Sequence, residues 1–370
     1  MGRTLAVRLD SDGDVLLTGP AVRALARLGH PVDLLASPSG AAAGRLLPDV
    51  AEVLEYPAPW SGFRPPPVDR DATTALVDDL AARGYDLAVV FTSFHQSPLP
   101  MALLARLAGI DRVVGTSEDY PGSLLDVRHR RADPPGGGHE VEAAVEVAVA
   151  AGAPRPAPEE LRLAVRRPLP SLPAAVAALP GPYVVLHPGA SVPSRGLTPE
   201  HAGALAAGLA DAGHAVVLTG GPGERGLTAA TLDAARSAPL GVAPPRGAVL
   251  DLGGRTDLPG LAAVLDAAAC VVVGNTGPAH LAAAVGTPVV SLFSPVVPPE
   301  RWAPYGVPVV LLGDQGADCR GSRARDCPVP GHPCLSSVAP ATVLAAVAEL
   351  TDGTPAATVT EPEGGRGCAS

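Results

Sequence analysis

The sequence predicts an α/β protein made of two Rossmann-like halves, each built around a parallel sheet. Short apolar runs alternate with helical patterns from residue 5 to residue 115, and the same alternation restarts at residue 183. Between them, residues 151–182 are crowded with prolines, as is typical of a connection between domains. Ligands of such folds bind at the carboxyl ends of the strands, so we expect a cleft between the two sheets.

The elements of the first half follow one another at short intervals. We expect strands at residues 5–9, 32–36, 86–91 and 112–115, with helices at 15–28, 73–83 and 100–107. Gly29 is expected to end the first helix.

The second half repeats this order. We expect strands at residues 183–186, 215–219, 270–273 and 288–293, with helices at 198–212, 258–269, 278–285 and 341–350. The predicted organisation is a Rossmann-like domain at 1–165, a proline-rich linker at 166–182, a second Rossmann-like domain at 183–352 and a flexible tail at 353–370.

Composition limits the classes of function. The 370 residues carry a formal net charge of -10, which argues against a nucleic-acid partner because such proteins need a basic face. The chain contains no lysine, so an anionic ligand would be held by arginines and helix N-termini. No run approaches the roughly 20 apolar residues of a membrane-spanning helix, and the N-terminus does not resemble a signal peptide. We therefore expect a cytoplasmic protein.

The first candidate site follows the first strand, at Asp10-Ser-Asp-Gly-Asp14. Gly13 permits a sharp turn, and Asp14 would lie at the start of the helix and face the cleft. An acidic helix cap is the alternative interpretation, because Asp is a favoured N-cap residue.

Two further candidates follow strands of the second half. In His187-Pro-Gly-Ala-Ser191 and the nearby Arg195, small residues permit close backbone approach, and Ser191 and Arg195 could hold a phosphate. In Thr219-Gly-Gly-Pro-Gly-Glu224, a glycine turn precedes a carboxylate suited to ribose hydroxyls. Ordinary surface loops are the alternative for both segments.

The most specific pattern is Asn275-Thr-Gly-Pro-Ala-His280, which follows a buried strand. We expect Asn275 to cap a helix whose first turn accommodates the proline, and the amides near Thr276 and Gly277 to form an anion site. His280 would point from the first turn toward the same site.

Three of the five cysteines, Cys319, Cys327 and Cys334, cluster in the sequence with His332. Their spacing lacks the close cysteine pairs of common zinc modules. We expect a loop with reduced thiols, no bound metal and no cofactor.

Taken in order over residues 4–350, these motifs resemble the family 9 glycosyltransferases, which include the ADP-heptose:lipopolysaccharide heptosyltransferases. The resemblance implies a GT-B fold and an inverting, metal-independent transfer of a sugar, expected to be a heptose, from an ADP-sugar to a hydroxyl acceptor. The first domain would then bind the acceptor and the second the nucleotide-sugar. The acceptor would be a small molecule or a glycan, with peripheral membrane association only if it is a lipid.

The resemblance also implies roles for the candidate residues. Asp14 would be the general base, and Glu224 would hold the ribose. The donor diphosphate would be bound by the remaining residues, namely Ser191, Arg195, Thr276, Gly277 and His280, with Asn275 beside the donor sugar.

The chain departs from the family pattern in two positions that bear on the donor. Leu197 stands where the family often has an aromatic residue, two positions after the basic residue. Asn275 stands where the family usually has Asp, so one negative charge near the donor sugar is missing. Two alternatives therefore stay open: another GT-B enzyme that uses a UDP-sugar, and a non-catalytic paralogue that binds a nucleotide-sugar.

Overall fold

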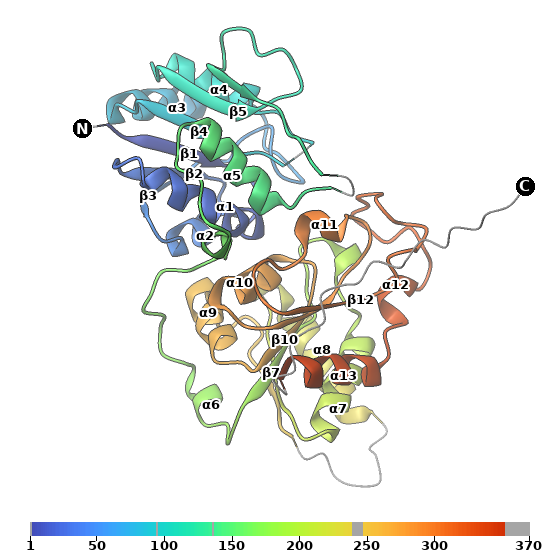
Figure 1. Ribbon diagram of the computed structural model, residues 1–370. Helices are drawn as coiled ribbons and strands as arrows, with labels where there is room; N and C mark the ends of the chain where they lie inside the picture. Colours follow the sequence, from blue (N-terminus) through green and yellow to red (C-terminus); the bar gives the residue numbers. More distant parts are fainter. Residues whose placement is uncertain (1, 94, 135–136, 239–246, 352–370) are drawn as a thin grey trace, which may run out of the picture.

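The computed structural model describes residues 2–93, 95–134, 137–238 and 247–351, which form two stacked lobes (Figure 1). Each lobe contains a parallel six-stranded sheet, ordered β3-β2-β1-β4-β5-β6 in the N-terminal lobe and β12-β11-β10-β7-β8-β9 in the C-terminal lobe. The expected α/β class with two Rossmann-like sheets is confirmed, and the architecture is GT-B. The predicted tail at 353–370 lies outside the described residues.

In the N-terminal lobe, β1 and its two neighbours β2 and β4 form the centre of the sheet. The strands are β1 (Thr4–Arg8), β2 (Val32–Ala36), β3 (Val50–Glu55), β4 (Leu87–Val90), β5 (Arg112–Thr116) and β6 (Val127–His129). The helices are α1 (Asp12–Ala26), α2 (Ala41–Leu46), α3 (Arg70–Arg83), α4 (Leu99–Leu107) and α5 (Glu140–Ala150).

In the C-terminal lobe, β7 and β10 pair at the centre of the sheet. The strands are β7 (Tyr183–His187), β8 (Ala215–Leu218), β9 (Val249–Asp251), β10 (Cys270–Gly274), β11 (Val289–Leu292) and β12 (Val309–Leu312). The helices are α6 (Ala174–Ala177), α7 (Pro199–Asp211), α8 (Arg225–Ser237), α9 (Leu258–Asp266), α10 (Gly277–Val285), α11 (Pro299–Trp302), α12 (Pro333–Ser336) and α13 (Pro340–Thr351). Short 3₁₀ turns cover Pro158–Leu161, Pro193–Arg195 and Pro222–Glu224.

Alternation along the central strands divides the apolar residues between the two faces of each sheet. Leu5 and Val7 of β1 pack with α3 and α4, whereas Ala6 packs with α1, α2 and α5. This second cluster continues into the C-terminal lobe, where it includes residues of α9 and α10. One hydrophobic core therefore spans the junction between the lobes.

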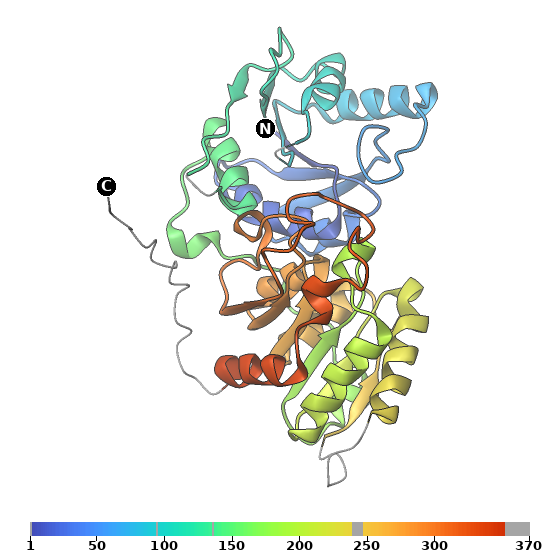
Figure 2. The same cartoon turned by 90° about the vertical axis from the view of Figure 1, so that its right-hand side faces the viewer.

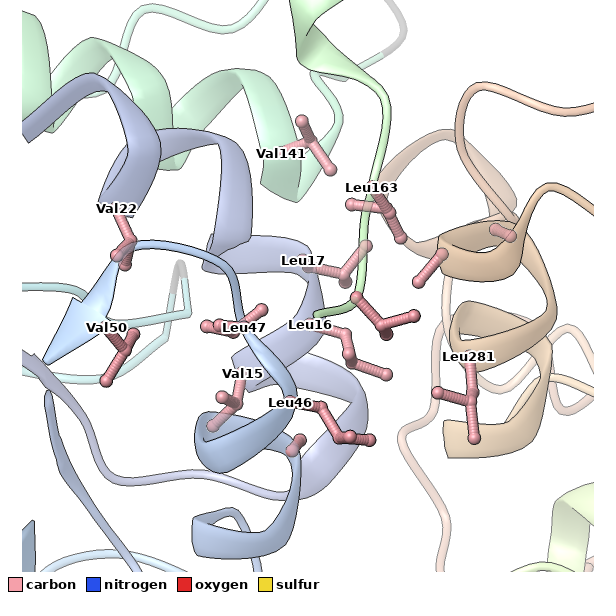
Figure 3. Close-up of a cluster of buried hydrophobic side chains, with 14 of the residues drawn as sticks. Val15, Leu16, Leu17, Val22, Leu46, Leu47, Val50, Val141, Leu163 and Leu281 are labelled. Atoms are coloured by element: carbon pink, nitrogen blue, oxygen red, sulfur yellow. The ribbon is translucent and has the colours of Figure 1, made fainter. Parts of the chain in front are cut away.

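Helices α1 and α10 meet at this junction. Figure 3 shows Leu16 and Leu17 on the side of α1 that faces α10, with Leu281 of α10 opposite them. At this contact the N-terminal turns of the two helices lie close together. Their separation is so small that a Cβ added to Gly13 would lie 3.3 Å from the Cα of Gly277. The junction therefore places the two expected ligand-binding turns face to face.

A second contact between the lobes involves the segment after β11. Figure 2 shows this segment, coloured orange to red, against the N-terminal lobe. Arg301 of α11 donates a hydrogen bond to Asp133 over 2.7 Å, and the Arg325 guanidinium lies 5.3 Å from the centre of the Phe63 ring.

The first helix begins earlier than the sequence predicts. Helix α1 starts at Asp12, with Ser11 as its N-cap, so Asp12, Gly13 and Asp14 form its first turn rather than a separate loop. Two carboxylates in this turn are favourable because they face the positive end of the helix dipole. No helix in the described part of the chain is long and apolar enough to cross a membrane.

Candidate active site

Asp14 lies in the first turn of α1 and is held by side chains rather than by a backbone amide. One carboxylate oxygen accepts a hydrogen bond from Arg8 over 3.1 Å, and the other accepts one from Ser11 over 3.0 Å. The Arg8 side chain is 3% exposed and that of Asp14 is 22% exposed. The Asp14 carboxylate is therefore accessible to solvent, whereas the arginine that holds it is buried. This arrangement does not match the alternative interpretation of Asp14 as a helix cap.

The two neighbouring carboxylates have other partners. Asp10 pairs with Arg8 over 2.9 Å and accepts a hydrogen bond from Gln96 over 2.5 Å. Asp12 accepts from the backbone amide of Ala43 near the start of α2. Burial raises the pKa of both Asp10 and Asp12. Of the three acids in the motif, Asp14 is therefore the one placed toward the junction with α10.

The start of α10 differs from the prediction in one respect. Thr276 is the N-cap, in extended conformation, and its side chain makes no capping hydrogen bond. The prediction that Asn275 caps this helix is wrong, because its side chain is directed to the end of β11. There its amide donates to the Ser294 carbonyl over 3.1 Å and accepts from the Ser294 amide over 3.0 Å.

Without a side-chain cap, the first amides of α10 can bind an anion, and the helix dipole favours negative charge there. Arg195 lies beside this turn, since a Cβ added to Gly274 at the end of β10 would collide with the Arg195 carbonyl oxygen. Burial lowers the pKa of Arg195, and the negative charge of Asp14 opposes that shift. Arg195 and Asp14 therefore place opposite charges on the two sides of the junction.

His280 completes the group of residues at the junction. Its side chain is buried, and a Cβ added to Gly13 would lie 3.0 Å from its ring. Burial lowers the pKa of His280 to about 4, with nearby Asp14 opposing the shift. The imidazole is therefore neutral at pH 7 and can take part in hydrogen bonds without adding charge.

Glu224 belongs to a second group, at the ends of β7 and β8. Its carboxylate accepts from the Gly221 amide over 2.7 Å and lies 3.6 Å from Nε2 of His187. His187 is buried, its pKa is lowered by burial, and its other ring nitrogen contacts Thr219. A Cβ on Gly189 would collide with the Glu224 carboxylate, so any larger residue there would displace this side chain from its present position.

Ser191 lies exposed in the loop after β7, four residues before Arg195. The same loop is anchored at Ser194. The Ser194 hydroxyl donates to the Ala324 carbonyl over 2.6 Å, and the Ser194 backbone carbonyl contacts the ring of His332. Ser194 and His332 thus connect the candidate donor loop to the cysteine-containing segment.

Cys319, Cys327 and Cys334 form no disulfide, and Cys319 and Cys334 are buried. Among the residues that the structure describes, no group of three or more His, Cys, Asp or Glu side chains is arranged to hold a metal ion.

Arg8 is the functional candidate that sequence reasoning missed. It ends β1, where an apolar strand gives little reason to expect a buried charge, and it links Asp10 and Asp14 and donates to Ser93 over 2.8 Å. The sequence does contain one indication of this role: Arg8 lies within the expected strand at residues 5–9, directly before the acidic motif at 10–14. A buried charge usually needs a partner of opposite charge.

Two parallel sheets in facing lobes, with a carboxylate on one lobe opposite an uncapped helix N-terminus on the other, are the arrangement of the GT-B fold. The chain belongs to glycosyltransferase family 9 (heptosyltransferase), whose family model matches residues 73–331. It is therefore a glycosyltransferase. A search of curated proteins finds no match.

Solved structures of the same architecture include three from E. coli. ADP-heptose lps heptosyltransferase II is 21% identical with a TM-score of 0.68, covering 94% of this chain and 98% of that one. Heptosyltransferase WaaC with ADP is 22% identical with a TM-score of 0.63, covering 94% and 99%. The iron-containing dodecameric glycosyltransferase TibC from strain H10407 is 15% identical with a TM-score of 0.53, covering 97% and 80%. At these identities the likeness establishes the fold.

Proposed function

We propose that this glycosyltransferase moves a sugar, expected to be a heptose, from an ADP-sugar to a hydroxyl group of its acceptor, with inversion at the anomeric carbon. The observation that carries the proposal is the position of Asp14 in the first turn of α1, which meets the start of α10 and the neighbouring Arg195 on the other lobe. Solved relatives that include WaaC with ADP-2-deoxy-2-fluoro heptose support the choice of donor.

In the proposed reaction, the Asp14 carboxylate takes the proton from the acceptor hydroxyl as its oxygen attacks the anomeric carbon. The bond from that carbon to the diphosphate oxygen breaks, and its electron pair leaves with the diphosphate. Attack and departure on opposite faces give inversion. Arg8 and Ser11 keep the carboxylate oriented throughout.

The leaving diphosphate gains negative charge, which fixed donors stabilise better than reorganising water. We assign this role to the amides near Thr276 and Gly277, together with Arg195. Ser191 and His280 would add hydrogen bonds, and Glu224 would accept from the ribose hydroxyls. In this proposal, donors supplied by the protein replace a divalent cation. Asn275 has a structural role, because both ends of its amide bind Ser294.

Isothermal titration calorimetry with ADP and UDP tests the choice of nucleotide. We expect ADP to bind at least about tenfold more tightly than UDP, a difference of about 1.4 kcal/mol. Tighter binding of UDP would favour the alternative UDP-sugar enzyme. Binding of ADP without any transfer from ADP-heptose to a crude acceptor extract would favour the non-catalytic paralogue.

The same transfer assay in excess EDTA tests metal independence, and we expect full activity. A strict requirement for added magnesium or manganese would contradict this part of the proposal. The cytoplasmic location stays a prediction.

A further inference from the structure

Two cavities open at the carboxyl edge of the N-terminal sheet, next to Asp14. The first, of about 210 Å³, lies between the ends of β4 to β6, α5 and α11, and Arg8 is part of its lining. The second, of about 380 Å³, lies between the ends of β1 and β4 and the loop around Trp60, and Asp10 is part of its lining. Phe91, Thr92 and Gln96 line both, so the cavities share one wall.

The second cavity offers no free cation among its described lining residues. Asp10 is its one charged side chain, and that carboxylate is already bound by Arg8 and Gln96. Burial lowers the pKa of His95, with Arg323, Asp14 and Arg8 as further influences, so this ring is neutral at pH 7. The rest of the lining is apolar or carries hydroxyl groups, and includes the indole of Trp60.

The first cavity contains three arginines, and each is paired with acids. Arg8 binds Asp10 and Asp14, two of the three carboxylates of the acidic motif. Arg131 binds Asp133 over 2.5 Å and Glu140 over 2.6 Å, and Arg301 binds Asp133 over 2.7 Å. The three arginines are thus offset by four carboxylates, Asp10, Asp14, Asp133 and Glu140. An acidic ligand would bring a further negative charge beside these carboxylates and compete with the existing ion pairs, which is costly.

Paired charges still present hydrogen-bond donors and acceptors to a ligand that carries no charge of its own. Hydroxyl groups can both donate and accept, so they match a wall of amide, hydroxyl, carboxylate and guanidinium groups. An aromatic ring such as that of Trp60 adds an apolar surface on which the face of a sugar ring can pack.

We propose that the two cavities together bind the acceptor, and that the part of the acceptor bound there is an uncharged sugar or glycoside. One ring packs on Trp60 and presents a hydroxyl group toward Asp14. This inference rests on the proposed function, because it assigns the acceptor of the same site. The paired arginines of the first cavity then select against acidic sugars, and Trp60 favours a sugar ring with an apolar face.

Saturation-transfer NMR on the ADP-saturated protein tests the inference without requiring turnover. The probes are methyl gluco-, galacto- and mannopyranoside, each compared with its uronate, in which a carboxylate replaces the terminal hydroxymethyl group. We expect at least one neutral glycoside to bind, and its uronate to bind at least about tenfold more weakly. Trp60→Ala should weaken binding of that glycoside by a similar factor, whereas Tyr120→Ala, at a residue 85% exposed and outside both linings, should not change it.

A uronate that binds as tightly as its neutral partner would overturn the inference, and would indicate that an acidic group reaches a cation such as Arg323. Absence of binding by all three neutral glycosides would overturn it as well. The choice of donor is judged separately, by the ADP and UDP titrations, so failure of the proposed function and failure of this inference are distinguishable.

Discussion

At the scale of single residues, Asp14 carries the proposed mechanism, and one substitution tests it. Asp14→Asn should lower turnover at least about 100-fold, since positioned general bases contribute about 10²–10⁴-fold. The amide keeps an oxygen that can accept from Arg8 or Ser11, so the melting temperature should change little. ADP affinity should also change little, because the diphosphate is assigned to the other lobe.

The matched control is Asp71→Asn, which removes an acid from the first turn of α3 instead of α1. It should leave turnover, melting temperature and ADP affinity unchanged. Normal turnover in the Asp14→Asn protein would show that another group is the base.

Asn275 gives a second residue-scale prediction. Asn275→Asp keeps an oxygen for the Ser294 amide but loses the donor to the Ser294 carbonyl, and it places a carboxylate in a buried site. We expect the free energy of unfolding to fall by about 1–3 kcal/mol, the usual cost of a buried polar group without its partner. Urea unfolding at pH 7.5 measures this change, and an unchanged unfolding free energy would contradict the structural role assigned to the amide.

These two residues also show what the sequence reveals at this scale. The motif around Asp14 follows a clear strand, so its position at a sheet edge could be predicted. The partner of Asn275 could not, because Ser294 is 19 residues away and comes close only when β10 and β11 pair in parallel. The role of Arg8 is similar, since Ser93 reaches it through the pairing of β1 with β4.

At the scale of elements, the N-terminus of α10 is the proposed diphosphate site. A Cβ on Gly277 would lie 3.7 Å from the Gly13 amide nitrogen, an ordinary contact, but the branches of valine would extend into the space between α10 and α1. Gly277→Val should therefore weaken ADP binding at least about tenfold, or 1.4 kcal/mol. The helix itself should not be weakened, because valine has a better helix propensity than glycine, so we expect the free energy of unfolding to change by less than about 1 kcal/mol.

Gly277→Ala provides the comparison, since a single methyl group fits and should weaken ADP binding less. Calorimetry on both variants, with melting temperatures measured alongside, checks the placement of the diphosphate. A folded Gly277→Val protein with unchanged ADP affinity would show that the diphosphate binds elsewhere.

Most central strands and helices of both lobes can be predicted from apolar periodicity. Several elements at the edges of the sheets and on the surface cannot. Strand β3 has a largely exposed, mixed pattern. Helix α8 buries Thr228, Thr231 and Ala235 rather than large apolar side chains, so it does not show as an apolar stripe in the sequence. The edge strands β6 and β9 have three residues each, too few for alternation to be recognised. The early start of α1 was missed because a Gly between two Asp residues resembles a turn.

At the scale of the whole molecule, the lobes are joined by helix packing at α1 and α10 and by polar contacts near α5. His139 is the N-cap of α5, where its Nδ1 accepts from the Val141 amide over 3.1 Å. Its Nε2 donates to the carbonyl of Ala303 in the C-terminal lobe over 2.9 Å. Tyr305 packs on the same ring and donates to Glu142 over 3.1 Å. A neutral imidazole therefore connects the two lobes with both of its nitrogens.

This connection predicts how stability depends on pH. Burial lowers the pKa of His139 to about 4, below the ordinary value of 6.5. Above pH 6.5 the imidazole is neutral in both the folded and the unfolded state, so its contribution is fully present. Between pH 6.5 and pH 4 the unfolded state binds a proton that the folded state does not, so the free energy of unfolding falls as the pH falls.

His139→Asn isolates this effect from other titrating groups, including His280. Asparagine still offers a capping oxygen to α5 but neither titrates nor reaches Ala303 as the imidazole does. At pH 7.5 the variant should have a lower free energy of unfolding than the natural protein. At pH 5, which is 1.5 pH units below the ordinary pKa of histidine, this difference in unfolding free energy should be smaller by about 2 kcal/mol. Urea unfolding at both pH values measures the two differences. If the difference is the same at pH 5 and pH 7.5, His139 is not held neutral at the junction, and the polar connection between the lobes has to be assigned to Arg301 and Tyr305 instead.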